Sequence, residues 1–213
     1  MKRPEKFGRF FVQTINFAEQ KKTKMNFSEY TSLFTSILNN PSPKAPYDNP
    51  DYFNYVKLNE SRQKRWIKHG ELLDETLEVI NSINEKQHWI LITEPWCGDA
   101  AHIVPFIILM ANLNSNIEVT IELRDEEPFR INEYLTNGGK AIPKLIVQSL
   151  EGTEFFSWGP RPESLQAIFH VLKKEGADFE QQKIVLQNWY NENKGIEIQR
   201  EIIALLRNLF NTK

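Results

Sequence analysis

Apolar residues along the chain recur at two spacings, and these alternate in the order expected of an α/β fold. Helical spacing over residues 73–80 predicts a helix, and the short apolar run at 88–93 predicts a buried strand. A second helix is predicted over residues 99–113. Strict alternation over 117–123 predicts a half-exposed strand whose polar positions face outward (Glu118, Thr120 and Glu122).

The pattern continues with a short helix and a hairpin. Residues 127–135 read as a helix that Asn137-Gly138-Gly139 ends. Two strands follow at 144–148 and 153–158, with Glu151-Gly152 as the turn between them. Pro162 then begins a helix, and two more helices are predicted near the C-terminus, at 181–190 and 198–210.

The chain before residue 72 has a different character. A helix over residues 28–38, which Ser28 could cap, is followed by prolines at four positions between 41 and 50. A further helix over 52–68 carries a basic cluster with Trp66 among it (Arg62, Lys64, Arg65 and Lys68). We interpret it as a solvated face, with contact to phosphates as the alternative.

The order from residue 72 onward predicts one α/β sandwich. A helix between consecutive strands implies parallel pairing, and the closing hairpin implies an antiparallel edge. We therefore expect a three-layer fold with a mixed central sheet and helices on both faces. The predicted division is a basic tail at 1–24, a helical extension with a proline-rich linker at 25–71, the sandwich at 72–175, and a C-terminal helical extension at 176–213.

Composition narrows the classes of function. With 26 basic and 28 acidic residues, the net charge of −2 gives no reason to expect nucleic acid as a partner. No apolar run is long enough for a membrane span, so we expect no membrane partner. The single cysteine excludes an intramolecular disulfide, and we expect a cytoplasmic protein. The basic segment 1–24 is expected to be disordered or to lie upstream of the true start at Met25; a transit peptide or a nucleic-acid arm is the alternative.

The chemistry centres on that cysteine. Cys97 stands between the predicted strand 88–93 and the start of the next helix. Free N–H groups and the helix dipole favour a thiolate there, whereas the nearby Asp99 and Glu94 oppose it, so the direction of the pKa shift is open. Cys97 is either an exposed nucleophile or a packed apolar residue. The four histidines show no metal-ligand spacing, and no metal site is expected.

Four features resemble the thioredoxin fold in order and spacing. Trp96-Cys97-Gly98 matches the start of the thioredoxin active-site motif, and Pro105 lies where the family has its helix proline. Ile142-Pro143 stands where the family keeps a cis-proline, and Trp158-Gly159 closes the hairpin. The resemblance covers roughly residues 72–175, and it is strongest to bacterial thioredoxin family proteins with a WCGD-type motif.

The resemblance implies a site. Cys97 would be the catalytic thiol, and Ile142 with a cis Pro143 would orient an extended peptide beside it. The remaining substrate-binding residues implied are Trp96, Gly98, Asp99, Trp158 and Gly159, the two tryptophans forming an apolar rim. Arg161 is read as a solvated loop charge, with contact to an anion or pairing to Asp99 as the alternatives.

Two departures limit that implication. Ala100 replaces the resolving cysteine, and Leu91 replaces a buried acid that helps to move protons in thioredoxin. The glutathione-binding loop of glutaredoxins is absent.

Two hypotheses therefore stand. The first is single-thiol disulfide exchange through a mixed disulfide at Cys97, with a protein or small-thiol disulfide as substrate. It needs no cofactor, although glutathione or another low-molecular-weight thiol could serve as co-substrate. The second is a redox-silent module that binds peptides or proteins in the groove. A buried or inert sulfur favours the second. The oligomeric state stays open.

Overall fold

The computed structural model describes residues 24–211, so the expectation for the basic segment at 1–24 lies, except for its last residue, outside the described part. The elements in chain order are β1 (Lys24–Met25), α1 (Phe27–Leu38), α2 (Pro50–His69), α3 (Asp74–Asn81), β2 (Gln87–Thr93), α4 (Ala100–Ala111), β3 (Ile117–Leu123), η1 (Arg130–Glu133), β4 (Lys144–Ser149), β5 (Glu154–Trp158), α5 (Glu163–Lys174), α6 (Phe179–Asn193) and α7 (Ile196–Asn211). The predicted fold class, an α/β sandwich with a mixed sheet and helical extensions, is the observed one.

A five-stranded sheet in the order β1-β3-β2-β4-β5 forms the centre. Strands β2 and β3 pair in parallel across the α4 crossover, and β4 pairs antiparallel with both β2 and β5. Strand β1 adds a short antiparallel edge to β3. The parallel pair and the closing hairpin are those that the element order predicts.

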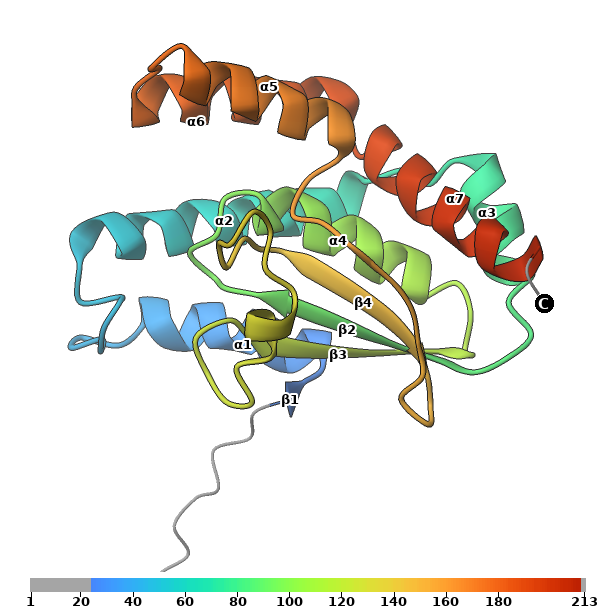
Figure 1. Ribbon diagram of the computed structural model, residues 1–213. Coiled ribbons are helices and arrows are strands. Elements are labelled where there is room, and N and C mark those ends of the chain that lie inside the picture. Colours follow the sequence, from blue (N-terminus) through green and yellow to red (C-terminus); the bar gives the residue numbers. More distant parts are fainter. Residues whose placement is uncertain (1–23, 212–213) are drawn as a thin grey trace, which may run out of the picture.

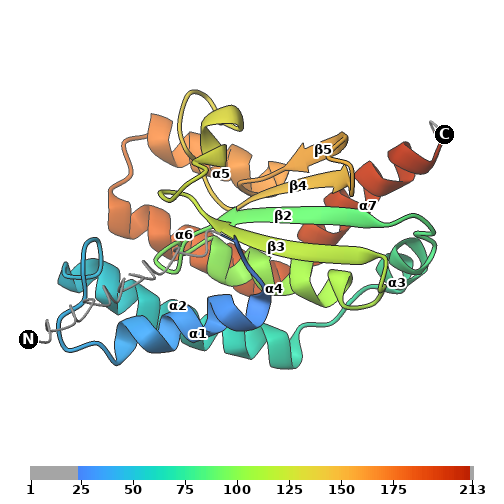
Figure 2. The same ribbon diagram turned by 90° about the horizontal axis from the view of Figure 1, so that it is seen from below.

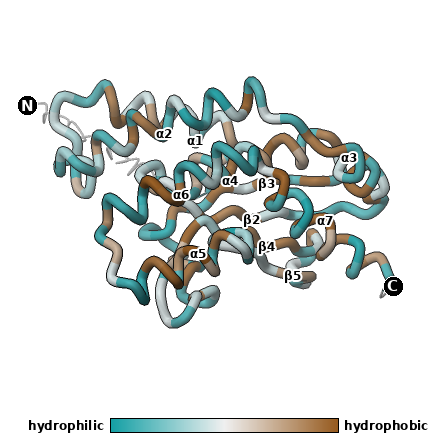
Figure 3. Tube along the Cα trace, turned by 90° about the horizontal axis from the view of Figure 1, so that it is seen from above, coloured by the Kyte–Doolittle hydropathy of each residue, from teal (hydrophilic) through white to brown (hydrophobic). Residues whose placement is uncertain are grey.

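Strand β2 is buried on both faces. Trp89 and Leu91 on one face and Ile90 and Ile92 on the other are each at most 1% exposed. Helices α2, α4 and α7 run along the upper side of the sheet in Figure 1, and the view from below shows α1 beside the β1–β3 edge (Figure 2). The central strands are the hydrophobic part of the trace, whereas the outer helices alternate between hydrophobic and hydrophilic positions (Figure 3). No helix in the described part is both long and apolar enough to cross a bilayer.

Helix α1 begins one residue earlier than expected, and Ser28 is not its cap. Asn26 is the N-cap: its side chain accepts from Glu29 N, and the Glu29 carboxylate accepts from Asn26 N, both at 2.9 Å. This reciprocal pair satisfies two backbone donors at the helix start. Asn49 caps α2 through a single hydrogen bond that its Oδ1 accepts from Asp51 N, with Pro50 as the first helical residue.

The helix predicted over 127–135 is wrong. Only the single 3₁₀ turn η1 forms, because Phe129 adopts a left-handed φ of 54° that breaks the helical path. The outward placement of Glu122 is also wrong. Glu122 is 1% exposed, and the Arg130 guanidinium binds it through two hydrogen bonds of 2.9 and 3.2 Å. This ion pair offsets the free-energy cost of burying the Glu122 carboxylate.

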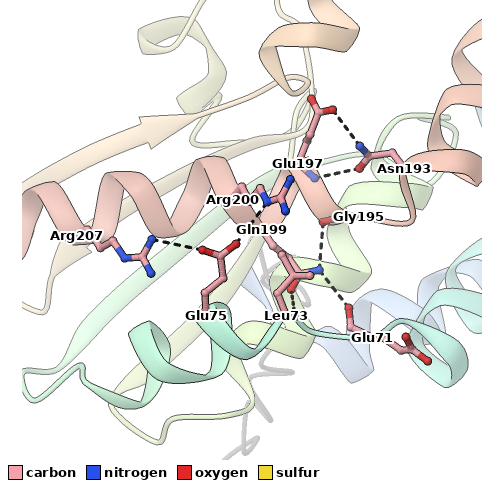
Figure 4. Close-up of polar contacts among 9 residues, drawn as sticks. All are labelled: Glu71, Leu73, Glu75, Asn193, Gly195, Glu197, Gln199, Arg200 and Arg207. Atoms are coloured by element: carbon pink, nitrogen blue, oxygen red, sulfur yellow. Dashed lines mark hydrogen bonds and ion pairs between the residues drawn. The ribbon is translucent and has the colours of Figure 1, made fainter.

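The C-terminal helix α7 packs on the body through buried apolar side chains and through the buried amide of Gln199. Gln199 is 0% exposed; its Oε1 accepts from Leu73 N at 2.9 Å, and its Nε2 donates to the carbonyls of Glu71 and Gly195 (Figure 4). Around it, Glu75 pairs with Arg200 and Arg207 at the surface. Helix α7 is thus part of the packed structure rather than a tail.

Candidate ligand-binding cleft beside Cys97

The loop between β2 and α4 holds Cys97 at the start of the helix. Cys97 N donates to Glu94 O at 3.0 Å, and Cys97 O accepts from Ala101 N at 3.3 Å, which continues the helical hydrogen bonds. Asp99 is the N-cap residue of α4, but its side chain makes no cap hydrogen bond. That carboxylate is engaged elsewhere, and the contacts it makes shape the site.

The Cys97 thiol is buried. The residue is 7% exposed, and Sγ donates to Ile142 O at 3.4 Å. The Ile142–Pro143 peptide bond is cis. Burial, followed by the charge of Asp99, raises the pKa of the Cys97 thiol to about 12; the backbone N–H groups of Ala100 and Asp99 and the charge of Arg161 only partly oppose this. The direction of the pKa shift at Cys97, which the sequence left open, is therefore upward, and the neutral thiol is favoured.

Asp99 lies in a polar cluster that links three elements. Arg161 Nη2 pairs with Asp99 Oδ2 at 2.6 Å, and both side chains are nearly buried, at 13% and 11% exposed. The Tyr190 hydroxyl, in α6, donates to Asp99 Oδ1 at 2.9 Å. The Arg161 guanidinium also stacks on the Phe169 ring at 4.1 Å. The pairing of Arg161 with Asp99, which was the lesser alternative from sequence, is the observed arrangement.

His102 lies one turn further along α4, and both of its ring nitrogens are hydrogen-bonded to residues other than Cys97. The Trp66 indole N–H donates to His102 Nδ1 at 2.9 Å, which leaves Nε2 as the protonated nitrogen that faces Gln187 Oε1 at 3.1 Å. The imidazole stacks on Tyr190 with a centroid distance of 4.5 Å. Burial and the nearby Arg62 charge lower the pKa of His102 to about 3. His102 is therefore a neutral structural link between α2, α4 and α6.

These elements enclose a cleft of about 700 Å³. Its walls come from α2, the Cys97 loop, residues 140–142, α5 and α6. Aromatic side chains line much of it (Tyr52, Tyr55, Trp96, Phe169 and Phe179). Six basic residues line it against two acidic ones, Asp51 and Asp99. A volume of this size suits a small ligand or a short peptide segment.

The structure brings five of the eight expected site residues to the cleft wall: Trp96, Cys97, Gly98, Asp99 and Ile142. Pro143, Trp158 and Gly159 do not line it. The Trp158 indole N–H donates to Glu201 Oε2 at 2.7 Å, so this ring packs towards α7 instead of forming a rim. Gly159 has a φ of +113°, and a Cβ there would lie 2.4 Å from Pro143 O, so only glycine fits behind Pro143.

Sequence reasoning missed the wall that α2 and α6 contribute. Arg62 was assigned to a solvated basic face, yet it lines the cleft, as do Lys183 and Tyr190 of α6. The available signal was the spacing of Tyr52, Tyr55 and Arg62, which lie three and seven residues apart and so share one helix face. It did not reveal which part of the core these residues would face.

A family model described as "Thioredoxin" matches residues 47–177. The chain belongs to the thioredoxin family. No curated protein matches the sequence. Among solved structures, this thioredoxin family protein is similar to a protein of unknown function, PA1234, from Pseudomonas aeruginosa, with 17% identity and a TM-score of 0.52 over 86% of this chain and 98% of that one. It is also similar to an HIV epitope-scaffold, with 16% identity and a TM-score of 0.51 over 86% and 99%. At such identities both show the fold alone.

The thioredoxin family match covers the region that holds the cleft, including α2, which precedes the range of the sequence resemblance. Its end at residue 177 leaves α6 and α7 outside. Helix α6 nevertheless closes one wall. In the described part, no group of three or more His, Cys, Asp or Glu residues is arranged to hold a metal ion.

Proposed function

We propose that this thioredoxin family protein is a binding module that takes a peptide segment non-covalently in the cleft beside Cys97. The observation that carries the proposal is the state of the sulfur: Cys97 is 7% exposed, hydrogen-bonded to Ile142 O, and its pKa is raised to about 12. At pH 7 such a thiol is almost entirely protonated. Thiol–disulfide exchange needs a thiolate, and little thiolate is present. Non-covalent binding needs only the cleft, which is already formed.

The lining of the cleft supports recognition rather than reaction. Tyr52 packs edge-on against Trp96 at a centroid distance of 5.5 Å, and the Arg124 guanidinium stacks over the Trp96 ring, 4.6 Å from its centroid. Trp96 is thereby held in one orientation at the wall. A rigid aromatic side chain of this kind provides contact area at low entropic cost.

The test is binding to an array of immobilised random short peptides, with the full chain and with two variants. Wild type and Cys97→Ser are expected to retain the same peptides, because the sulfur contributes no covalent bond. Trp96→Ala is expected to lose most of them. Retention of no peptide by wild type would refute the binding module.

A second candidate, single-thiol exchange, is favoured by the position of Cys97 in the cleft wall next to the cis Ile142–Pro143 bond. The Cys97 thiolate would displace one sulfur of a ligand disulfide as a thiolate and form a mixed disulfide. An external thiolate would then attack that disulfide, regenerate the Cys97 thiolate and leave with the ligand sulfur as a new disulfide.

Insulin reduction distinguishes the two candidates. Ala100 begins α4 and is fully buried, one helical turn from the thiol, so Ala100→Cys would supply the missing resolving thiol. Background rates in wild type, Ala100→Cys and Cys97→Ser, without an adduct on wild type, are expected for the binding module. An adduct at Cys97 in wild type and turnover in Ala100→Cys would establish the exchange reaction instead.

A further inference from the structure

The charge lining the cleft does not match the charge of the whole protein. The chain carries a net charge of −2, yet the cleft is lined by Arg62, Arg124, Lys140, Arg161, Lys173 and Lys183 against Asp51 and Asp99. Such a local excess of one sign in a low-dielectric cleft concentrates its field on whatever binds there. The question is how much of this charge is already neutralised within the protein.

Three of the six cations have carboxylate partners. Arg161 pairs with Asp99 at 2.6 Å, Arg124 with Asp125 at 2.6 Å, and Lys183 with Glu180 at 2.5 Å. Burial lowers the pKa of Arg161 and of Arg124, but their carboxylate partners outweigh it, and the net shift of each is upward. These cations serve the structure.

The other three, Arg62, Lys140 and Lys173, form no ion pair with any residue between 24 and 211. Arg62 is half-buried, and its Nη1 donates only to the neutral Asn59 Oδ1 at 3.1 Å. Burial and the charge of Arg65 lower the pKa of Arg62, the opposite of the shift at the paired arginines. A half-buried guanidinium without a counter-charge costs free energy that a bound anion would recover.

These three cations stand on three different walls. Arg62 projects from α2, Lys140 from the segment before Pro143, and Lys173 from α5, where it lies 5.0 Å from the Phe169 ring centroid. Aromatic side chains line the same cleft. A ligand that satisfies all three must carry several anionic groups separated by apolar ones, which is the pattern of an extended acidic peptide.

We infer that the cleft selects an acidic peptide segment whose carboxylates are received by Arg62, Lys140 and Lys173, with apolar side chains against the aromatic walls. This inference rests on the proposed binding function and names its ligand class. Selection by charge acts mainly on specificity and on association rate, and it weakens as salt is added.

Isothermal titration of the full, reduced chain tests it with two matched probes: a short peptide of alternating Glu and Leu, and the same peptide with every Glu replaced by Gln. The Glu peptide is expected to bind at least about tenfold more tightly at low salt, and raising the salt should shrink the difference. Free glutamate at equal carboxylate concentration is expected to displace little of the bound Glu peptide. Full displacement would show ionic screening without a peptide site and would overturn the inference.

Single substitutions show which residues cause the preference for the Glu peptide. Arg62→Gln and Lys140→Gln are each expected to weaken the Glu peptide about threefold to fivefold and to weaken the Gln peptide less. Lys64→Gln is the matched control, because it makes the same charge change on α2 at a residue that is 71% exposed, is paired with Glu60 and does not line the cleft. It should change neither affinity.

The outcomes separate this inference from the function on which it rests. Equal binding of the Glu and Gln peptides, or an effect of Lys64→Gln as large as that of Arg62→Gln, would overturn the acidic preference and leave peptide binding intact. If the peptide array shows retention but the retained peptides are not enriched in Glu and Asp, the inference fails in the same way. Retention of no peptide refutes the binding module itself.

Discussion

The Tyr190 hydroxyl donates a 2.9 Å hydrogen bond to Asp99 Oδ1, across 91 residues of sequence. Asp99 lies two residues after Cys97, and Tyr190 lies in α6, outside the matched thioredoxin region. Helix α6 has only this one buried residue, and it touches the body through few polar contacts, which include Gln187 on His102 and Asn191 on Arg65. This hydrogen bond is therefore a principal tie between the C-terminal extension and the Cys97 loop.

Removing that tie should expose the sulfur. Tyr190→Phe keeps the ring stacked on His102 but deletes the hydroxyl, and it is expected to cost about 1.5–2 kcal/mol of unfolding free energy, since the acceptor is a nearly buried carboxylate. Helix α6 should detach more often, and alkylation of Cys97 by iodoacetamide should accelerate. The measurements are urea unfolding and the alkylation rate at a fixed pH.

Tyr134→Phe is the matched control for this change. Its hydroxyl also donates to a carboxylate, that of Glu154, but at the surface and away from the cleft. It is expected to leave the alkylation rate unchanged. Equal acceleration in both variants would show that the Tyr190 hydroxyl does not hold the cleft closed.

The buried amide of Gln199 should carry much of the stability of the C-terminal extension. In Gln199→Ala, Leu73 N–H and Glu71 C=O lose their partner in a partly buried environment, and the expected loss is about 1–3 kcal/mol. Arg207→Ala removes only a 3.5 Å ion pair between residues that are 47% and 38% exposed, and it should cost less than about 1 kcal/mol. Chemical unfolding of the two variants measures the difference; equal losses would contradict the role assigned to Gln199.

Glu94 should make stability depend on pH. Burial raises the pKa of Glu94 from 4.5 to about 7, while the Asp125 N–H that its Oε1 accepts opposes the shift only weakly. The folded state thus binds the proton more tightly than the unfolded state. This contribution is fully present below about pH 4.5 and is lost as pH rises through about 7; its size is on the order of 3 kcal/mol.

A Glu94→Gln variant isolates that contribution. The amide cannot ionise, and its oxygen can still accept from Asp125 N. His102 titrates in both proteins, so its effect cancels in the difference. The stability of wild type relative to Glu94→Gln is expected to rise as pH is lowered from 7 to 4.5, measured by urea unfolding at several values of pH. A difference that does not vary with pH would show that Glu94 ionises normally.

The spacing of apolar and polar residues predicted most of the helices and strands, because each of these elements shows the periodicity of its own secondary structure. Strand β3 was expected at 117–123 and is found there, and the β4–β5 hairpin forms around Glu151-Gly152 as its turn residues indicate. The error at Glu122 arises because a residue outside its strand decides its burial. Glu122 alternates like an exposed residue, and only the position of Arg130 beside it in the fold explains its burial.

The candidate site shows the same limit. Cys97 and Ile142 could be placed together through a family motif, and the cleft wall contains both. The wall formed by Arg62 and Lys183 depends on how α2 and α6 pack around α4, and no local pattern encodes that packing. For the same reason, the sequence left the pKa of Cys97 open: helix dipole and neighbouring carboxylates could be weighed, but the burial that outweighs both is a property of the assembled fold.

The ionisation of Cys97 tests the central claim most directly. The chain has one cysteine, so the rate of iodoacetamide alkylation of the native protein against pH reports that sulfur alone. Burial that raises the pKa of Cys97 to about 12 predicts a slow rate that rises about tenfold per pH unit from pH 6 to 10 without a plateau, while free glutathione, with a thiol pKa near 9, levels off within that range. A plateau with a midpoint below about pH 8 would reveal a ready thiolate, contradict the non-covalent binding module and establish Cys97 as a nucleophile.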